Sequence, residues 1–103
     1  MIGSANGARI GITGLGVHVP DRVVTNDELS TMVDTNDEWI VARTGIRERR
    51  IAAAEEALTD LALPAARAAL EGAGLRGADV EFLVVATVTP DMAFPASAAI
   101  LAD

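Results

Sequence analysis

A continuous apolar run from Val80 to Thr89 is the feature that most limits how this chain can fold. Runs of this kind are typical of a strand that is covered on both faces, as in α/β proteins. A second candidate strand, Ala8 to Val19, is rich in Ile, Val and Gly and ends at Pro20. Because two such strands cannot close a core alone, we expect the isolated polypeptide not to fold stably and its faces to be covered by further chain.

Two short helices are predicted between these runs. Thr25-Asn-Asp-Glu28 and Thr35-Asn-Asp-Glu38 each have the capping-box arrangement, with Thr as N-cap and Glu reaching back to the cap. They predict helices over about 26–33 and 36–44, the second ended by Gly45. The alternating segment from Ile46 to Ala53 could be extended.

A longer helix is predicted from Thr59-Asp60 to about Ala73, ended by Gly72, Gly74 and Gly77. Pro64 lies inside it and should kink or locally unwind it. Leu61, Ala65, Ala68 and Ala69 form a stripe of mostly small side chains that suits close packing against a sheet. In the first strand, Gly14 and Gly16 allow a bulge or a close backbone approach.

The last segment runs from Pro90 through a loop at Phe94-Pro95 into a helix that starts at Ala96. Phe94 follows the buried strand at its C-terminal edge, where an exposed aromatic could line a pocket or a subunit contact, or could anchor the loop. The order of elements predicts an α/β fold.

Composition excludes several classes of function. The net charge is −7, which argues against general nucleic-acid binding. The chain has no Cys, so it holds no disulfide, thiolate metal site or thiol nucleophile, and no other metal-ligand spacing is present. No secretory signal or membrane span is recognisable, so we expect a cytoplasmic protein. His18, the one histidine, is interpreted as structural, and residues 1–7 as a disordered N-terminus.

One constellation could bind a ligand. Thr35, Trp39 and Arg43 are spaced i, i+4, i+8, which places them on one face of a helix. An indole face and a guanidinium could hold an adenine or a nucleotide phosphate, or could simply contact each other at a rim. Four arginines lie close together and could receive an anion or pair with nearby acids: Arg43, Arg47, Arg49 and Arg50.

The stretch from Asp34 to Ala52 resembles the signature of the β-ketoacyl-acyl-carrier-protein synthase III family. Its Asp-Thr-Asn-Asp-Glu-Trp-Ile start and its Arg-Thr-Gly-Ile-Arg-Glu-Arg run follow the family pattern almost without gaps. The glycines at 14 and 16 and the two segments 84–89 and 93–96 follow in the family's order, so the resemblance covers roughly Ile10 to Asp103.

The resemblance implies a thiolase-like fold, with five α-β-α-β-α layers in the whole family, of which residues 8–103 are an incomplete N-terminal domain. It implies a homodimeric acyltransferase that starts fatty-acid synthesis by decarboxylating condensation of acyl-CoA with malonyl-acyl carrier protein. CoA is then a substrate and no cofactor is expected. Thr35, Trp39 and Arg43 match the family's CoA-binding residues, and Phe94 matches an aromatic that lines the acyl pocket across the dimer.

The same resemblance implies that the catalytic Cys, His and Asn lie beyond Asp103, so this chain contains no catalytic residue and should be inactive by itself. Three alternatives remain open. One is a priming synthase of polyketide or other secondary metabolism, and a second is another CoA-condensing enzyme such as a hydroxymethylglutaryl-CoA synthase. The third is a non-catalytic CoA-binding remnant.

Overall fold

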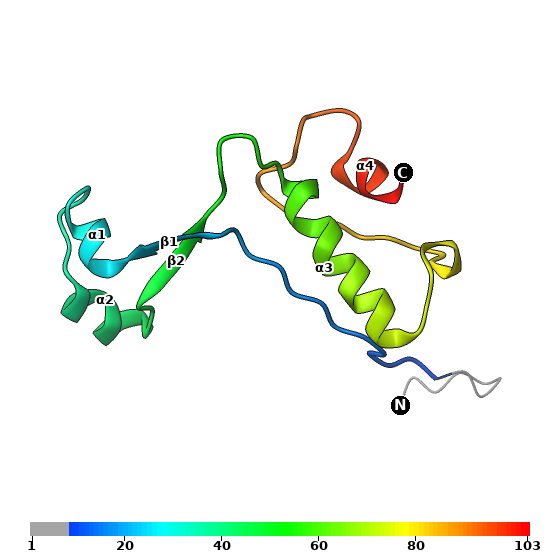
Figure 1. Ribbon diagram of the computed structural model, residues 1–103, viewed down its shortest axis with the longest axis horizontal. Helices are drawn as coiled ribbons and strands as arrows, with labels where there is room; N and C mark the ends of the chain where they lie inside the picture. Colours follow the sequence, from blue (N-terminus) through cyan, green and yellow to red (C-terminus); the bar gives the residue numbers. More distant parts are fainter. Residues whose placement is uncertain (1–8) are drawn as a thin grey trace.

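The computed structural model describes residues 9–103, whose elements form two groups joined by extended chain (Figure 1). The first group contains β1 (Arg22–Thr25), α1 (Asn26–Ser30), α2 (Asp37–Thr44) and β2 (Glu48–Ile51). The second contains α3 (Leu58–Ala73), the 3-10 helix η1 (Gly77–Asp79) and α4 (Ser97–Ala102). The predicted disorder of residues 1–7 lies outside the described residues.

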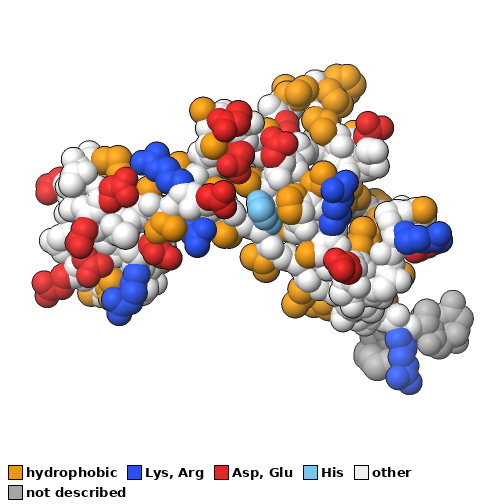
Figure 2. Space-filling view, viewed as in Figure 1, with side chains coloured by type: hydrophobic (Ala, Val, Ile, Leu, Met, Phe, Trp, Pro, Cys, Tyr) orange, Lys and Arg blue, Asp and Glu red, His pale blue; other side chains and the backbone are white. Residues whose placement is uncertain are grey.

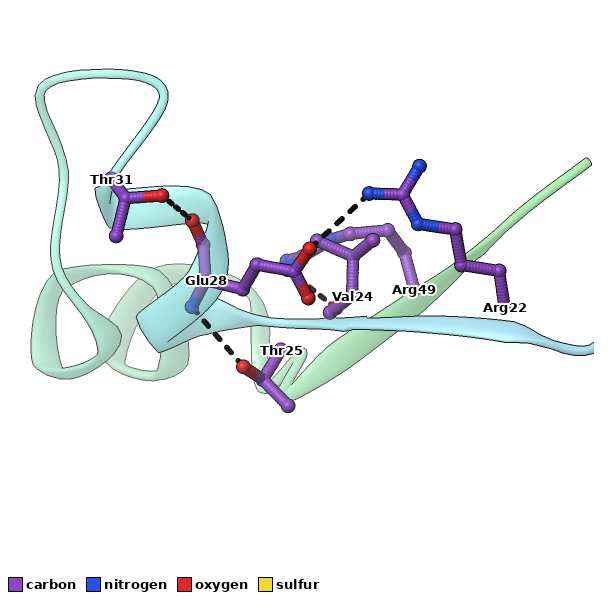
Figure 3. Close-up of polar contacts among 6 residues, drawn as sticks. All are labelled: Arg22, Val24, Thr25, Glu28, Thr31 and Arg49. Atoms are coloured by element: carbon purple, nitrogen blue, oxygen red, sulfur yellow. Dashed lines mark hydrogen bonds and ion pairs between the residues drawn. The ribbon is translucent and has the colours of Figure 1, made fainter.

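The start of α1 follows the prediction in part. Thr25 is the N-cap, and its hydroxyl accepts a hydrogen bond from the Glu28 N–H at 3.1 Å. The Glu28 carboxylate does not reach back to the cap; it accepts a hydrogen bond from Arg22 at 3.2 Å (Figure 3). The helix ends at Ser30, earlier than predicted, because the hydroxyls of Ser30 and Thr31 bond back to carbonyls of the same turn.

The start of α2 corrects the prediction by one residue. Asn36, not Thr35, is the N-cap, and its side chain accepts a hydrogen bond from the Trp39 N–H at 2.8 Å. Asn caps helices at least as well as Thr, so the neighbouring residues compete and the surrounding packing decides. Gly45 ends the helix in the left-handed region, with φ 71°, as predicted.

β1 and β2 form a two-stranded antiparallel sheet in which Val24 lies opposite Arg49. The extended segment predicted after Gly45 is thus confirmed, whereas β1 was not predicted because its four residues run directly into a helix cap. The Arg49 guanidinium donates to the Val24 carbonyl at 3.1 Å, which ties the two strands together through a side chain (Figure 3).

Asn26, the first residue of α1, joins three elements of the first group. Its side chain is 1% exposed, and its amide nitrogen donates to the Asp37 carboxylate at 2.7 Å and to the Ile46 carbonyl at 2.8 Å. Its amide oxygen accepts from Arg49 at 2.7 Å. Since a buried amide is costly unless it is bonded, these contacts fix α1, α2 and β2 in one arrangement.

α3 is a single helix of 16 residues that passes through Pro64 without interruption, so the predicted local unwinding is wrong. Pro64 lies in the second turn and is exposed. It leaves one carbonyl of the first turn without its usual N–H donor, and the remaining backbone bonds hold the helix. The helix ends at Gly74, in the left-handed region with φ 68°.

The N-terminus of α3 is capped from a distant part of the chain. Asp91 accepts hydrogen bonds from the Thr59 N–H at 3.2 Å and from the Thr59 hydroxyl at 2.6 Å. A carboxylate at this position satisfies an unpaired helix N–H and faces the positive end of the helix dipole. The hydrogen bonds from Thr59, followed by the Ser97 hydroxyl, lower the pKa of Asp91 against the opposing effect of burial.

The two predicted strands do not form as strands. The parts of 8–19 and 80–89 that the structure describes have no strand hydrogen bonds, since no neighbouring strand is available among residues 9–103. The close backbone approach predicted for the glycines is confirmed. Gly14 and Gly16 face the small-residue side of α3, where the Ala69 and Ala65 carbonyls leave no room for a Cβ atom.

The structure has almost no interior. Among residues 9–103 the buried hydrophobic side chains are Val24 and Ile40, while Ile10, Phe82 and Val88 are at least 84% exposed. The chain exposes 8375 Å², against about 5,500 Å² expected of a compact domain of this size. Figure 2 shows hydrophobic side chains open to solvent over the part of the molecule that holds α3 and α4. These exposed apolar faces need to be covered by further protein.

The glycine contact with α3 can be tested by substitution in the full-length protein. Gly16→Ala should destabilise it by about 1–3 kcal/mol, because the new methyl group would overlap the Ala65 carbonyl oxygen and force the segment away from α3. Gly11→Ala is the control, since a methyl group there meets nothing within 4 Å. Denaturant unfolding of both variants measures the difference, and equal midpoints would contradict the packing described.

The Asp91 cap should make stability depend on pH. Because folding lowers the Asp91 pKa, its contribution is complete above the unfolded value of about 3.9 and is lost as the pH falls through the folded value. Unfolding of the full-length wild type and Asp91→Asn should therefore differ at pH 6 and converge toward pH 3. A difference that stays constant over this range would show that the carboxylate charge is not involved.

Candidate functional site

Trp39 and Arg43 form the one cation–π pair found among residues 9–103. They lie one turn apart on α2, and the Arg43 Cζ atom is 4.7 Å from the centroid of the indole ring. Trp39 is 53% exposed, so the stacked pair faces solvent. The contact predicted from the i, i+4 spacing is therefore confirmed, and it presents a flat, positively charged surface.

The separation of the pair limits how a flat ligand could bind. A planar ring inserted between indole and guanidinium needs about 7 Å, which is twice a van der Waals contact of about 3.5–4 Å. At 4.7 Å the two groups already touch, so the Arg43 side chain would have to swing outward to admit a ring. The alternative is a ring stacked on an outer face of the pair.

Thr35 lies just before α2, outside the helix on which the spacing placed it. Its hydroxyl oxygen is buried, and no hydrogen-bond partner for it is present in the described part of the chain. A buried hydroxyl without a partner is unusual and carries a cost of about 1–3 kcal/mol. Thr35 is thus close in sequence to Trp39 and Arg43 but does not share their helical face.

The arginine cluster is used largely inside the structure. Arg49 bonds to Val24 and Asn26, and Arg50 donates to the Pro20 carbonyl at 2.9 Å. These acceptors are neutral oxygens, so the expectation of pairing with nearby acids is not met for these two side chains. Arg43, stacked on Trp39, and Arg47 are both exposed, so these two members of the cluster remain available to an anion.

Phe94 lies in the loop between Asp91 and Ser97 and is 87% exposed. Within the described residues the ring is not packed against the chain, so its assignment to a pocket, a subunit contact or a loop anchor stays a prediction. Figure 1 shows that the loop before α4 and helix α2 lie in different groups of elements. The structure does not bring Phe94 together with Trp39 and Arg43.

Other predicted features carry little chemistry. His18 is exposed in the extended segment that runs along α3. Over residues 9–103 no three side chains of the His, Cys, Asp or Glu type meet in a way that could hold a metal ion. Within the same range, no helix combines the length and the apolar character needed to cross a membrane.

Two polar residues that organise these sites were not singled out from the sequence. Asn26 was interpreted only as part of a helix start, and Asp91 only as part of a loop. An Asp directly after the Pro that ends a predicted strand is a local signal for a cap or turn. Which helix it caps could not be inferred, since Thr59 is 32 residues away.

No family model matches the chain. It is similar to curated and solved proteins, however. It is 59% identical, over 92 residues and 89% of its length, to the β-ketoacyl-[acyl-carrier-protein] synthase III of Symbiobacterium thermophilum, of which it spans 28%.

Two crystal structures extend the comparison to the fold. The 3-oxoacyl-[acyl-carrier-protein] synthase III of Aquifex aeolicus is 46% identical with a TM-score of 0.83, over 88% of this chain and 29% of that one. The priming β-ketosynthase of the R1128 polyketide pathway is 37% identical with a TM-score of 0.82, over 93% of this chain and 30% of that one.

The arrangement is thus part of the thiolase-like fold of these enzymes, as expected, and the chain spans less than a third of the length of the relatives it matches. That short coverage agrees with the large uncovered apolar surface. In sequence and in fold, this stretch of chain belongs to the β-ketoacyl-[acyl-carrier-protein] synthase III family.

Proposed function

We propose that these residues are the N-terminal part of a β-ketoacyl-acyl-carrier-protein synthase III that initiates fatty-acid synthesis. In this proposal residues 8–103 belong to a thiolase-like domain, and the full-length enzyme condenses acyl-CoA with malonyl-acyl carrier protein in the cytoplasm. The observation that carries it is the exposed Trp39–Arg43 pair on α2, within a stretch 59% identical to a synthase of that name.

The proposed task of this pair is to hold the nucleotide end of CoA. An indole face and a guanidinium plane suit stacking on adenine, and the guanidinium charge suits the adjacent phosphates. The Thr35 hydroxyl beside α2 is buried without a hydrogen-bond partner in the described chain, and its side chain would have to turn outward to bond to a bound nucleotide. Trp39, Arg43 and Thr35 would then contribute binding and orientation, and no bond would change at them.

The reaction itself needs groups from elsewhere in the full-length protein. The chain contains no Cys, so the thiol that would attack the acyl-CoA thioester must lie outside these residues. The His and Asn that would assist decarboxylation and stabilise the developing negative charge are likewise proposed to lie outside them. Residues 1–103 alone would be inactive.

Phe94 is proposed to line the acyl pocket of the second subunit of a homodimer. Its ring is 87% exposed, although full burial of such a side chain is worth about 1.5–3 kcal/mol. A subunit partner that covers it would remove this cost. The loop before α4 would then belong to the dimer interface.

A priming synthase for polyketide formation is the second candidate, favoured by the TM-score of 0.82 to such an enzyme. It ranks lower because identity to it is 37%, against 59% to the synthase of Symbiobacterium thermophilum.

The proposed function is tested by the reaction of the purified full-length protein with acetyl-CoA or longer acyl-CoA and malonyl-acyl carrier protein. Formation of β-ketoacyl-carrier protein and CO₂ supports the proposal, and absence of both leaves a CoA-binding remnant.

The CoA clamp predicts a defined kinetic change. In the full-length enzyme, Trp39→Ala and Arg43→Ala should each raise KM for acyl-CoA by about 2- to 30-fold, which corresponds to about 0.5–2 kcal/mol of stacking. The kcat should change little, because binding far from the reacting thioester is equal in ground and transition states.

Two controls make this prediction specific. Arg76→Ala removes an exposed arginine from a different group of elements and should leave KM unchanged. Acyl-pantetheine lacks the nucleotide, so KM for it should be the same in wild type and in the Trp39 and Arg43 variants. Equal losses with both thioesters would show that the pair supports the fold and does not bind the nucleotide.

A further inference from the structure

The loop that carries Phe94 is closed at its two ends by a reciprocal pair of hydrogen bonds. The Asp91 N–H donates to the Ser97 hydroxyl oxygen at 3.1 Å, and that hydroxyl donates to the Asp91 carboxylate at 3.0 Å. Ser97 is 4% exposed, so these bonds are shielded from competing water. Residues 92–96 therefore span between two fixed points.

The same carboxylate fastens the loop to α3. Thr59 donates its backbone N–H to one carboxylate oxygen at 3.2 Å and its hydroxyl to the other at 2.6 Å. With Ser97, the Asp91 carboxylate accepts from three donors of two separate elements. Bonds to an ionised acceptor are stronger than neutral ones, so the carboxylate cannot turn without losing several of them.

The residues between the two fixed points are not held by packing. Phe94 is 87% exposed and Met92 is 50% exposed. The direction in which the Phe94 ring is presented is therefore set by the backbone of the loop. That backbone is set in turn by the hydrogen bonds of Asp91.

We propose that Asp91, together with Thr59 and Ser97, is a positioning group that holds loop 92–96 so that Phe94 enters the second subunit's acyl pocket in one orientation. This inference rests on the proposed function, because it assigns Phe94 to that pocket. A ring held in one place limits the length of acyl chain that fits beside it. A ring on a loose loop limits it less, so the Asp91 contacts determine acyl-chain preference through Phe94.

The chain offers a matched control for Asp91. Asp60 also supports the start of α3, since its carboxylate accepts a hydrogen bond from the Ala57 N–H at 2.8 Å. This hydrogen bond of Asp60 involves neither loop 92–96 nor Ser97. Asp60→Ala therefore weakens the same helix start without loosening the loop, whereas Asp91→Ala does both.

The experiment uses the full-length enzyme and a series of acyl-CoA substrates from two to eight carbons. The measured quantity is the ratio of kcat/KM for the longest and the shortest chain, in wild type, Asp91→Ala, Asp60→Ala, Phe94→Ala and the Asp91→Ala/Phe94→Ala double variant. Asp91→Ala should raise this ratio by roughly 5-fold or more, within the range that pocket contacts achieve for small differences in chain length. Asp60→Ala should leave it unchanged.

The double variant tests whether Asp91 acts through Phe94. If it does, adding Asp91→Ala to Phe94→Ala should change the ratio by less than about 2-fold, because the ring it positions is gone. Asp91→Asn retains one carbonyl acceptor and should restore part of the wild-type ratio. If Asp91→Ala does not fold, Asp91→Asn and Ser97→Ala take its place in the experiment.

Hydrogen exchange of the same proteins gives a readout that is independent of activity. Amides in segments 57–60 and 91–97 should exchange faster in Asp91→Ala than in wild type, and 91–97 should be unaffected in Asp60→Ala. Faster exchange with an unchanged ratio would overturn the inference and leave the proposed function intact. Unchanged exchange would also overturn it, while a wild type that forms no condensation product would refute the proposed function and this inference together.

Discussion

The first group of elements depends on one buried amide. Asn26 is 1% exposed and has bonds from its side chain to Asp37, to the Ile46 carbonyl and to Arg49. Few apolar contacts accompany it, since Val24 and Ile40 are the buried hydrophobic residues of the described chain. Where so little apolar surface is covered, a fully bonded polar group is what gives α1, α2 and β2 a single arrangement.

That arrangement places the candidate CoA-binding surface. Asp37 is the first residue of α2, so its bond to Asn26 fixes the start of the helix, whose first turn carries Trp39. Asn36 caps the same turn through the Trp39 N–H. The direction of the stacked Trp39–Arg43 pair therefore follows from two polar contacts at the beginning of α2.

The second group relies on a different device, which is close packing against α3. Small side chains on α3 and the glycines at 14 and 16 let two backbones approach until no Cβ atom fits between them. Asp91 joins the loop of Phe94 to the start of the same helix. Much of the remaining apolar surface stays open, as Figure 2 shows, and this agrees with a chain that spans 28% of a relative's length.

Local chemistry was predictable wherever a few neighbouring residues decide the outcome. The Thr25 cap, the Gly45 stop, the long helix ending before Gly74 and the Trp39–Arg43 contact all depend on spacings of three to four residues. The signature from Asp34 to Ala52 also sufficed to predict the family that the comparisons support. Intrinsic preferences and helical geometry determine such features, and both are written in short stretches of sequence.

Tertiary structure decided what depends on distant residues. Asn36, not Thr35, caps α2, next to Asp37, whose carboxylate accepts a hydrogen bond from Asn26. β1 formed because β2 lies beside it and pairs with it. Conversely, the described parts of the apolar runs 8–19 and 80–89 did not become strands, because a strand exists only where a neighbouring strand accepts its hydrogen bonds. The sequence alone thus determined the helices, the stacked pair and the family. Pairing between distant segments determined the cap at Asp91 and the fate of every candidate strand.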